Sequence, residues 1–206
     1  MTPNELTLEA YSSSNLRKHT SPNPLQRLLL ERFHAAARRL LASVAPAPRR
    51  ILDAGCGEGF AMQAVLGATQ AEVLGLDGSA MAVQLAGRLN PGRHFAAGDL
   101  YTLPFAARSF ELVVCMEVLE HLDEPARGLR ELRRVSAGWL LLSVPNEPLF
   151  RGANFLRGKN VRAWGNDPGH LNHWSQRAFL RFVALHCPVV ATHTSFPWTL
   201  ALCRVE

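Results

Sequence analysis

The chain has 206 residues, of which 48% are hydrophobic and 19% are charged, with a formal net charge of +5. This composition excludes a disordered chain and is sufficient for a single full core. No apolar run is long enough to span a bilayer, and the polar N-terminus lacks the apolar stretch of a secretory signal. We therefore expect a cytoplasmic protein of one domain, as a monomer or homodimer, with no membrane span.

The cysteines indicate neither a disulfide framework nor a zinc site. They lie far apart and show no C-x-x-C spacing, at Cys56, Cys115, Cys187 and Cys203. We interpret them as reduced thiols.

The positive charge is concentrated at the N-terminus. Residues 1–50 hold eight basic and three acidic side chains, whereas the other 156 residues are balanced. The basic segment could attract an anionic acceptor or a nucleic acid. It could equally be a solvated helix face, since the basic residues are scattered without aromatics. Nucleic acid is therefore not the expected partner.

The first predicted element is a helix that begins after a polar lead-in at residues 1–22. Asn23 is suited to cap it and Pro24 to occupy its first position. Apolar residues recur at helical spacing up to Leu41, and Pro46 follows its end.

A short apolar strand then leads into Asp53-Ala54-Gly55-Cys56-Gly57-Glu58-Gly59. Glycines at alternate positions allow a sharp turn and the close approach of a ligand to the backbone. The spacing differs from the G-x-G-x-x-G of dinucleotide-binding proteins, which disfavours a nicotinamide enzyme. An acid two residues before the first glycine can bind an ammonium group. We expect an amphipathic helix after this loop.

Strands and helices alternate from there onward. Predicted strands cover 73–76, 94–97, 110–115 and 139–144, a helix begins at Ser79 and another at Ser175, and two final strands cover 188–194 and 197–203. This alternation predicts an α/β fold with a parallel sheet covered by helices on both faces. Acids follow several strand ends, at Asp53, Asp77, Asp99 and Glu117. They should therefore line one crevice.

The acid–glycine loop resembles motif I of the class I S-adenosylmethionine (SAM) methyltransferases, and the later acids follow in that family's order. The resemblance implies a Rossmann-like sheet of seven strands in the order 3-2-1-4-5-7-6, with the last strand antiparallel. It also implies a single domain with an N-terminal helical cap at 1–48, a cofactor-binding core at 49–145, and an acceptor lid with edge strands at 146–206. The implied cofactor is SAM, with S-adenosylhomocysteine as its product. The implied cofactor-binding residues are Asp53, Gly55, Cys56, Gly57, Gly59, Asp77, Gly78, Asp99, Leu100 and Glu117.

The segment Cys115–His121 is similar to the same region of the ubiquinone O-methyltransferases and of related small-molecule methyltransferases. Glu117, Glu120 and His121 are spaced to share one face of a short helix. His121 could act as a general base. The three residues could instead bind a divalent ion, which we do not favour, or form only local hydrogen bonds.

A second polar segment lies at Asp167–Ser175. We expect His170, His173 and Trp174 either to line the acceptor pocket or to hold a lid loop, and a metal site that includes Asp167 is disfavoured. The motifs of amino-methylating nucleic-acid enzymes and of 5-methylcytosine enzymes are absent from the segment after residue 115.

The expected function is methyl transfer from SAM to a small-molecule or lipid-like acceptor, at oxygen or nitrogen, by direct in-line displacement. The alternatives are an RNA methyltransferase that uses the basic N-terminal helix, and a SAM-binding regulator without catalysis.

Overall fold

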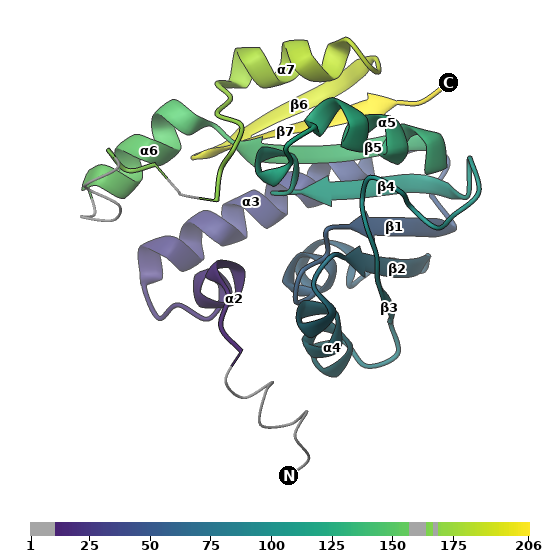
Figure 1. The fold of residues 1–206 in the computed structure, drawn as a ribbon, viewed down its shortest axis with the longest axis horizontal. Coiled ribbons are helices and arrows are strands. Elements are labelled where there is room, and N and C mark those ends of the chain that lie inside the picture. The colour runs from purple at the N-terminus through teal and green to yellow at the C-terminus, as the bar shows by residue number, and fades with distance from the viewer. Residues whose placement is uncertain (1–10, 157–163, 167–168) are drawn as a thin grey trace.

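The computed structural model describes residues 11–156, 164–166 and 169–206, and these contain one seven-stranded sheet in the order β3-β2-β1-β4-β5-β7-β6 (Figure 1). The strands are β1 Arg50–Ala54, β2 Glu72–Asp77, β3 His94–Ala97, β4 Phe110–Met116, β5 Ser136–Pro145, β6 Val189–Ser195 and β7 Trp198–Arg204. The helices are α2 Ser14–His19, α3 Pro24–Ala42, α4 Ala80–Leu89, α5 Pro125–Val135, α6 Glu147–Leu156 and α7 Gln176–Ala184.

The strand directions agree with the predicted fold. β1 to β5 pair in parallel, and β7 is antiparallel to both β5 and β6. The chain order reverses between β1 and β4, which are neighbours in the sheet, and such a switch point is where open α/β sheets bind ligands. The predicted strand order is thus confirmed.

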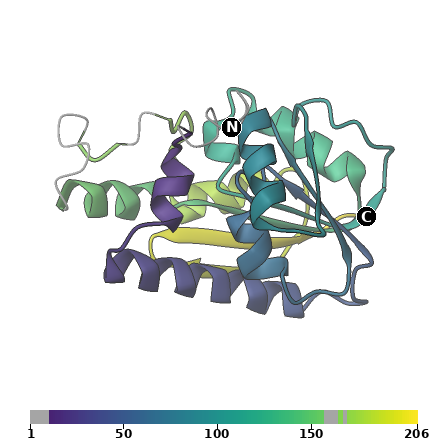
Figure 2. The ribbon, with the colours of Figure 1, turned by 90° about the horizontal axis from the view of Figure 1, so that it is seen from below.

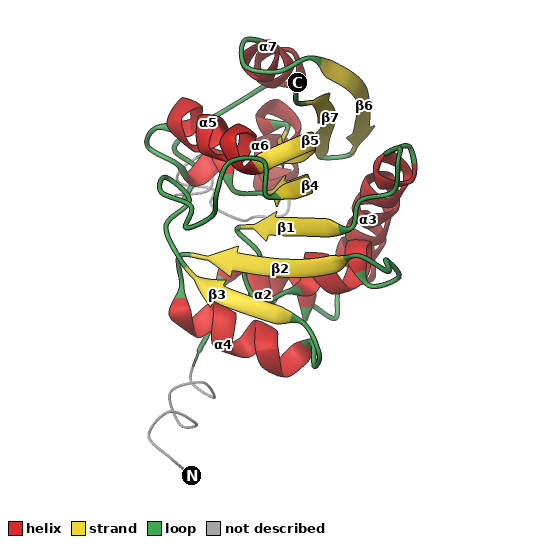
Figure 3. Ribbon diagram, turned by 90° about the vertical axis from the view of Figure 1, so that its right-hand side faces the viewer, coloured by secondary structure: helices red, strands yellow, loops and turns green. Residues whose placement is uncertain are grey.

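Helices cover both faces of the sheet, as Figure 3 shows for α3 on one side and α5 on the other. Successive strand residues alternate between two apolar cores: Ile51 packs with α3 residues such as Phe33, whereas Leu52 packs with Leu132 of α5 and Phe179 of α7. This burial on both faces explains the continuous apolar strands.

The predicted helix starts are confirmed by their hydrogen bonds. Asn23 Oδ1 accepts from the first-turn amides of α3, Ser79 Oγ caps α4, and Ser175 Oγ caps α7. Each side-chain oxygen satisfies a backbone N–H that has no partner within the helix.

Two local elements differ in detail from the expectation. The amphipathic helix expected after the glycine loop is a short π-helical segment at Met62–Leu66, where Arg38 Nη1 donates to the carbonyl of Ala64. The polar lead-in contains α2, which Ser13 caps. Figure 2 shows α2 above α3 and turned across its axis.

Within the described ranges, no helix combines the length and the apolar character needed to cross a membrane.

Candidate functional site

The glycine loop after β1 has a backbone that side chains rarely permit. Gly55, Gly57 and Gly59 have φ angles of +79°, +51° and +79°. A Cβ added at Gly55 would lie 2.3 Å from Cγ2 of Val118, and one at Gly59 would lie 2.5 Å from Nδ2 of Asn90. These positions therefore require glycine for both conformation and space.

Asp77 at the end of β2 holds this loop in place. Its Oδ2 accepts from the N–H of Gly57 at 2.8 Å, and its Oδ1 accepts from the N–H of Ser79 at 2.8 Å. The loop is further tied to β2 because Gly55 and Cys56 both donate to the carbonyl of Leu76. Each Asp77 oxygen retains a second lone pair with which it can accept from a hydroxyl.

Asp53 at the end of β1 is only 2% exposed, and its Oδ2 has no hydrogen-bond partner in the described part of the chain. Burial, together with the nearby charge of Asp77, raises the pKa of Asp53 to about 7. A cationic group beside Asp53 would restore the ionised carboxylate.

The third acidic loop follows β3 and lies beside the second. The N–H of Gly98 donates to the carbonyl of Asp77 at 2.9 Å, and a Cβ built on Gly78 would lie 4.0 Å from Gly98 O. The exposed Asp99 accepts from the N–H of Tyr101 through Oδ1 at 2.8 Å, and Leu100 is buried in the core. The ends of β1, β2 and β3 thus present their loops together.

The expectation that Glu117, Glu120 and His121 share one helical face was wrong. Only Leu119–His121 form a 3₁₀ turn, and Glu117 precedes it with φ +61°. Glu117 turns toward β7, where its Oε2 accepts from Nε1 of Trp198 at 2.6 Å. Glu120 is buried at 1% exposure, whereas His121 is exposed and places Nδ1 2.6 Å from the carbonyl of Gly169.

Burial raises the pKa of both glutamates. The pKa of Glu120 lies well above its usual range because of burial and the nearby charge of Glu117. Burial also raises the pKa of Glu117. The positive charge of Lys18 opposes this rise, since its Nζ lies 4.0 Å from Oε2 of Glu117. Acids with strongly raised pKa values are a frequent feature of active sites.

The histidine segment reaches the same place through a residue that the sequence analysis missed. Glu147 begins α6 and is 3% exposed, and its Oε1 lies 2.5 Å from Nδ1 of the buried His170. His173 is farther away, with Nδ1 3.7 Å from the same oxygen. The ring of Trp174 packs against Phe179 and Phe182 of α7, so its contact with an acceptor stays a prediction. Asp167 lies outside the described residues.

Three aromatic side chains before His173 lie in different surroundings. The ring of Phe150 lies 5.2 Å from that of His170. Phe155 and Trp164 stack on each other and are exposed at 41% and 72%. Among the described residues, Phe150 is therefore the one of these three rings that lies beside His170.

The sequence analysis also missed Glu58. Its side chain is 1% exposed and accepts hydrogen bonds from Tyr11, Ser13 and Asn15, which tie the N-terminal segment to the glycine loop. These bonds outweigh the opposing effect of burial, so the pKa of Glu58 is lowered. Nothing in the local sequence could identify partners more than 40 residues away. The N-terminal segment thus lies against the loop.

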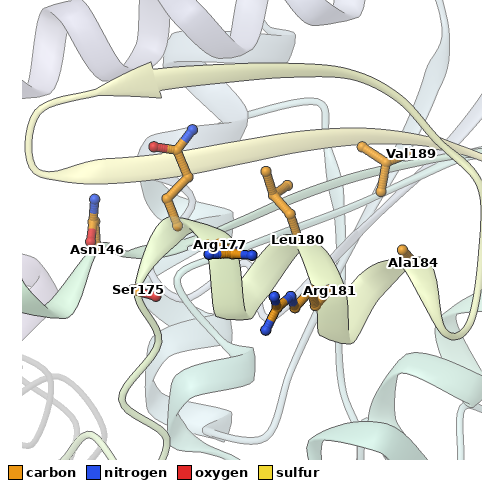
Figure 4. Close-up of a pocket in the computed structure, with 8 residues that line it drawn as sticks. Asn146, Ser175, Arg177, Leu180, Arg181, Ala184 and Val189 are labelled. Carbon is orange, nitrogen blue, oxygen red and sulfur yellow. The ribbon is translucent and has the colours of Figure 1, made fainter.

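An open groove of about 740 Å³ lies elsewhere, between α7 and β6 (Figure 4). Arg177, Leu180 and Arg181 line it from the helix, and Asn146 lies at one end. None of the strand-end acids lines this groove. This groove is therefore separate from the glycine loop and the strand-end acids.

Comparison with known proteins identifies the family of this chain. A family described as a methyltransferase domain matches residues 26–185. A Mycobacterium tuberculosis protein named as a SAM-dependent methyltransferase is 34% identical over 104 residues, which cover 50% of this chain and 38% of that protein. A tRNA U34 carboxymethyltransferase of Methylococcus capsulatus is 37% identical over 106 residues, covering 47% of this chain and 32% of that enzyme. The chain thus spans well under half the length of these two relatives.

Solved structures agree with the fold. The magnesium protoporphyrin IX methyltransferase of Synechocystis, determined with S-adenosylhomocysteine, superposes with a TM-score of 0.71 at 18% identity, covering 98% of this chain and 99% of that one. A methyltransferase of Haloferax volcanii, in complex with the activator Trm112, gives a TM-score of 0.67 at 19% identity, covering 87% and 92% of the two chains. The chain belongs to the methyltransferase-domain family, and its fold is that of the class I SAM-dependent methyltransferases.

Proposed function

We propose that this domain transfers a methyl group from SAM to a small-molecule or lipid-like acceptor, at an oxygen or nitrogen atom. One observation carries the proposal: the glycine loop after β1 contacts the loop after β4. Val118, next to Glu117, fills the space in which a side chain at Gly55 would lie. A cofactor seated on the first loop would therefore be adjacent to the buried acids of the second.

The residues present fit the cofactor. The buried, unpartnered Oδ2 of Asp53 suits the ammonium of the methionine moiety. The second lone pairs of Asp77 suit the ribose hydroxyls. By resemblance to the family, Asp99 and the N–H of Leu100 would bind the adenine. When bound, SAM supplies a methyl group on a sulfonium, which is suited to direct in-line displacement.

The protein's own contribution would be to position the acceptor and remove its proton. The acceptor would lie between the glycine loop and a group that we call the Glu–His cluster, made up of Glu117, Glu120, His121, Glu147 and His170. Proton removal by His121 as a base, or through a cation held by the cluster, would serve a hydroxyl acceptor. Positioning alone contributes much of the acceleration in such transfers.

The first experiment is calorimetry with SAM and S-adenosylhomocysteine, followed by transfer of a labelled methyl group to phenols, quinone precursors and carboxylic acids. Micromolar binding of both nucleosides and transfer to one of these classes are the expected results. Binding without transfer to any acceptor class would favour the regulator alternative. Absence of binding to folded protein would contradict the proposal.

RNA is the second candidate acceptor, favoured by the basic N-terminal segment and by the name of the Methylococcus relative. Part of this basic charge is engaged within the fold, because Arg38 pairs with Glu31 at 2.7 Å and donates to Ala64. Labelled transfer to tRNA, with binding that weakens steeply as salt rises, would favour this candidate.

A further inference from the structure

Two segments far apart in the sequence meet at the Glu–His cluster. The carbonyl of Glu120 accepts from the N–H of Leu171 at 2.8 Å and from that of Asn172 at 3.0 Å. The side chain of Asn172 also donates to the carbonyl of Leu122 at 2.6 Å. These bonds hold His170 beside the 3₁₀ turn. Its ring centroid lies 5.1 Å from that of His121.

This arrangement brings three metal-binding side chains together. One ligand atom each from Glu120, His121 and His170 lie within 4.8 Å of one another. Ligands 2.0–2.2 Å from a tetrahedral ion lie about 3.4 Å apart. The ligand atoms therefore need to move closer together by up to about 1.4 Å around an ion.

Both histidine rings are oriented by hydrogen bonds at Nδ1. His121 Nδ1 lies 2.6 Å from the carbonyl of Gly169, and His170 Nδ1 lies 2.5 Å from Oε1 of Glu147. A carbonyl and an ionised carboxylate only accept, so in each neutral ring Nδ1 carries the hydrogen and Nε2 the lone pair. A carboxylate or carbonyl on the second nitrogen is the usual environment of a histidine that binds a metal.

Glu120 supplies an independent observation. It is 1% exposed, and neither carboxylate oxygen has a hydrogen-bond partner among residues 11–156, 164–166 and 169–206. Glu117 Oε1 and Glu147 Oε2 are likewise buried without such a partner. Buried carboxylates are normally paired or bound to a cation. A nearby cation is Lys18, whose Nζ lies 4.0 Å from Oε2 of Glu117. This contact involves neither oxygen of Glu120.

We propose that Glu120, His121 and His170 bind a divalent transition-metal ion of the Zn²⁺ or Mn²⁺ type, with Glu147 orienting His170 from behind. Two imidazole ligands favour Zn²⁺ over Mg²⁺ and Ca²⁺, which prefer oxygen, and the carboxylate of Glu120 also suits Mn²⁺. Three protein ligands leave coordination positions open, which is the pattern of a catalytic rather than a structural site.

The role of the ion rests on the proposed methyl transfer. An acceptor hydroxyl bound at an open position has a lowered pKa. Its O–H bond would break as the proton passes to water. The electron pair left on the oxygen would then form the bond to the methyl carbon while the carbon–sulfur bond of SAM breaks. His121 is then a metal ligand rather than the general base.

The test is metal binding to protein stripped with a chelator, followed by calorimetry with Zn²⁺, Mn²⁺ and Mg²⁺ and by the visible spectrum of added Co²⁺. We expect one ion per chain, with Zn²⁺ and Mn²⁺ at least tenfold tighter than Mg²⁺. Glu120→Gln, His170→Ala and the surface variant His121→Ala should each weaken binding more than 100-fold. Glu147→Gln should weaken it 10- to 100-fold.

The matched control is His94→Ala, an exposed histidine at the start of β3, which should leave the affinity unchanged. Wild-type protein that binds no ion, or binding that survives in both His121→Ala and His170→Ala, would overturn the proposal. S-adenosylhomocysteine affinity and melting temperature are measured for every variant. Nucleoside binding without ion binding would refute this inference alone, whereas ion binding without nucleoside binding would refute the proposed function alone.

Discussion

Replacement of Asp77 by asparagine tests whether this carboxylate positions the glycine loop for cofactor binding. The carboxylate accepts from the N–H of Gly57 and from that of Ser79, both at 2.8 Å. An asparagine oxygen can satisfy only one of them, and its NH₂ group then faces the other donor. Loss of one charge-assisted bond costs about 1.5–3 kcal/mol, and a weakened ribose contact adds to it. We expect a loss of about 3 kcal/mol in binding, or ~150-fold in Kd.

The assay is calorimetric titration of S-adenosylhomocysteine into wild-type and Asp77→Asn protein. Glu72→Gln is the matched control, since Glu72 lies at the exposed opposite end of the same strand. It should bind like the wild type. A Kd for Asp77→Asn within twofold of the wild type, in a variant that melts normally, would refute the assignment of Asp77 to the cofactor site.

Three further predictions concern stability. Gly59→Ala should lower the free energy of unfolding, measured in urea, by about 2–3 kcal/mol, because residue 59 has a φ of +79° and a Cβ there would clash with Asn90. A loss below about 0.5 kcal/mol would contradict the need for glycine at this position. Trp198→Phe should lower the free energy of unfolding by about 1.5–3 kcal/mol at pH 7, because it removes the 2.6 Å bond to the partly buried carboxylate of Glu117. Unchanged urea stability would show that this bond contributes nothing. Because the pKa of Asp53 is raised to about 7 in the folded state, the folded protein binds its proton more tightly than the unfolded chain, so this group lowers stability as pH rises from about 4 to 7. Asp53→Asn should flatten that decline in pH-dependent urea melts, and an unchanged slope would contradict the raised pKa.

The glycine loop, the strands and the helix starts could be predicted because each depends on residues that are close together in the sequence. A strand that ends in Asp53 followed by alternate glycines specifies a turn with positive φ angles, and all three glycines adopt them. Strand periodicity and the residues Asn23, Ser79 and Ser175 likewise indicated the sheet and its helix starts. These features depend on neighbours within a few residues, so the amino-acid order alone is informative.

The Glu–His cluster depended on tertiary structure. Helical spacing placed Glu117 with Glu120 and His121, but a left-handed residue at Glu117 turns its side chain to Trp198, 81 residues away. The position beside Glu120 and His121 is taken instead by His170, which Glu147 orients. Such contacts result from the packing of distant segments, because a buried carboxylate takes whichever donor or cation the fold brings to it. Sequence therefore determined the family, the strand order and the glycine loop, whereas only the tertiary structure decided which acids and histidines meet.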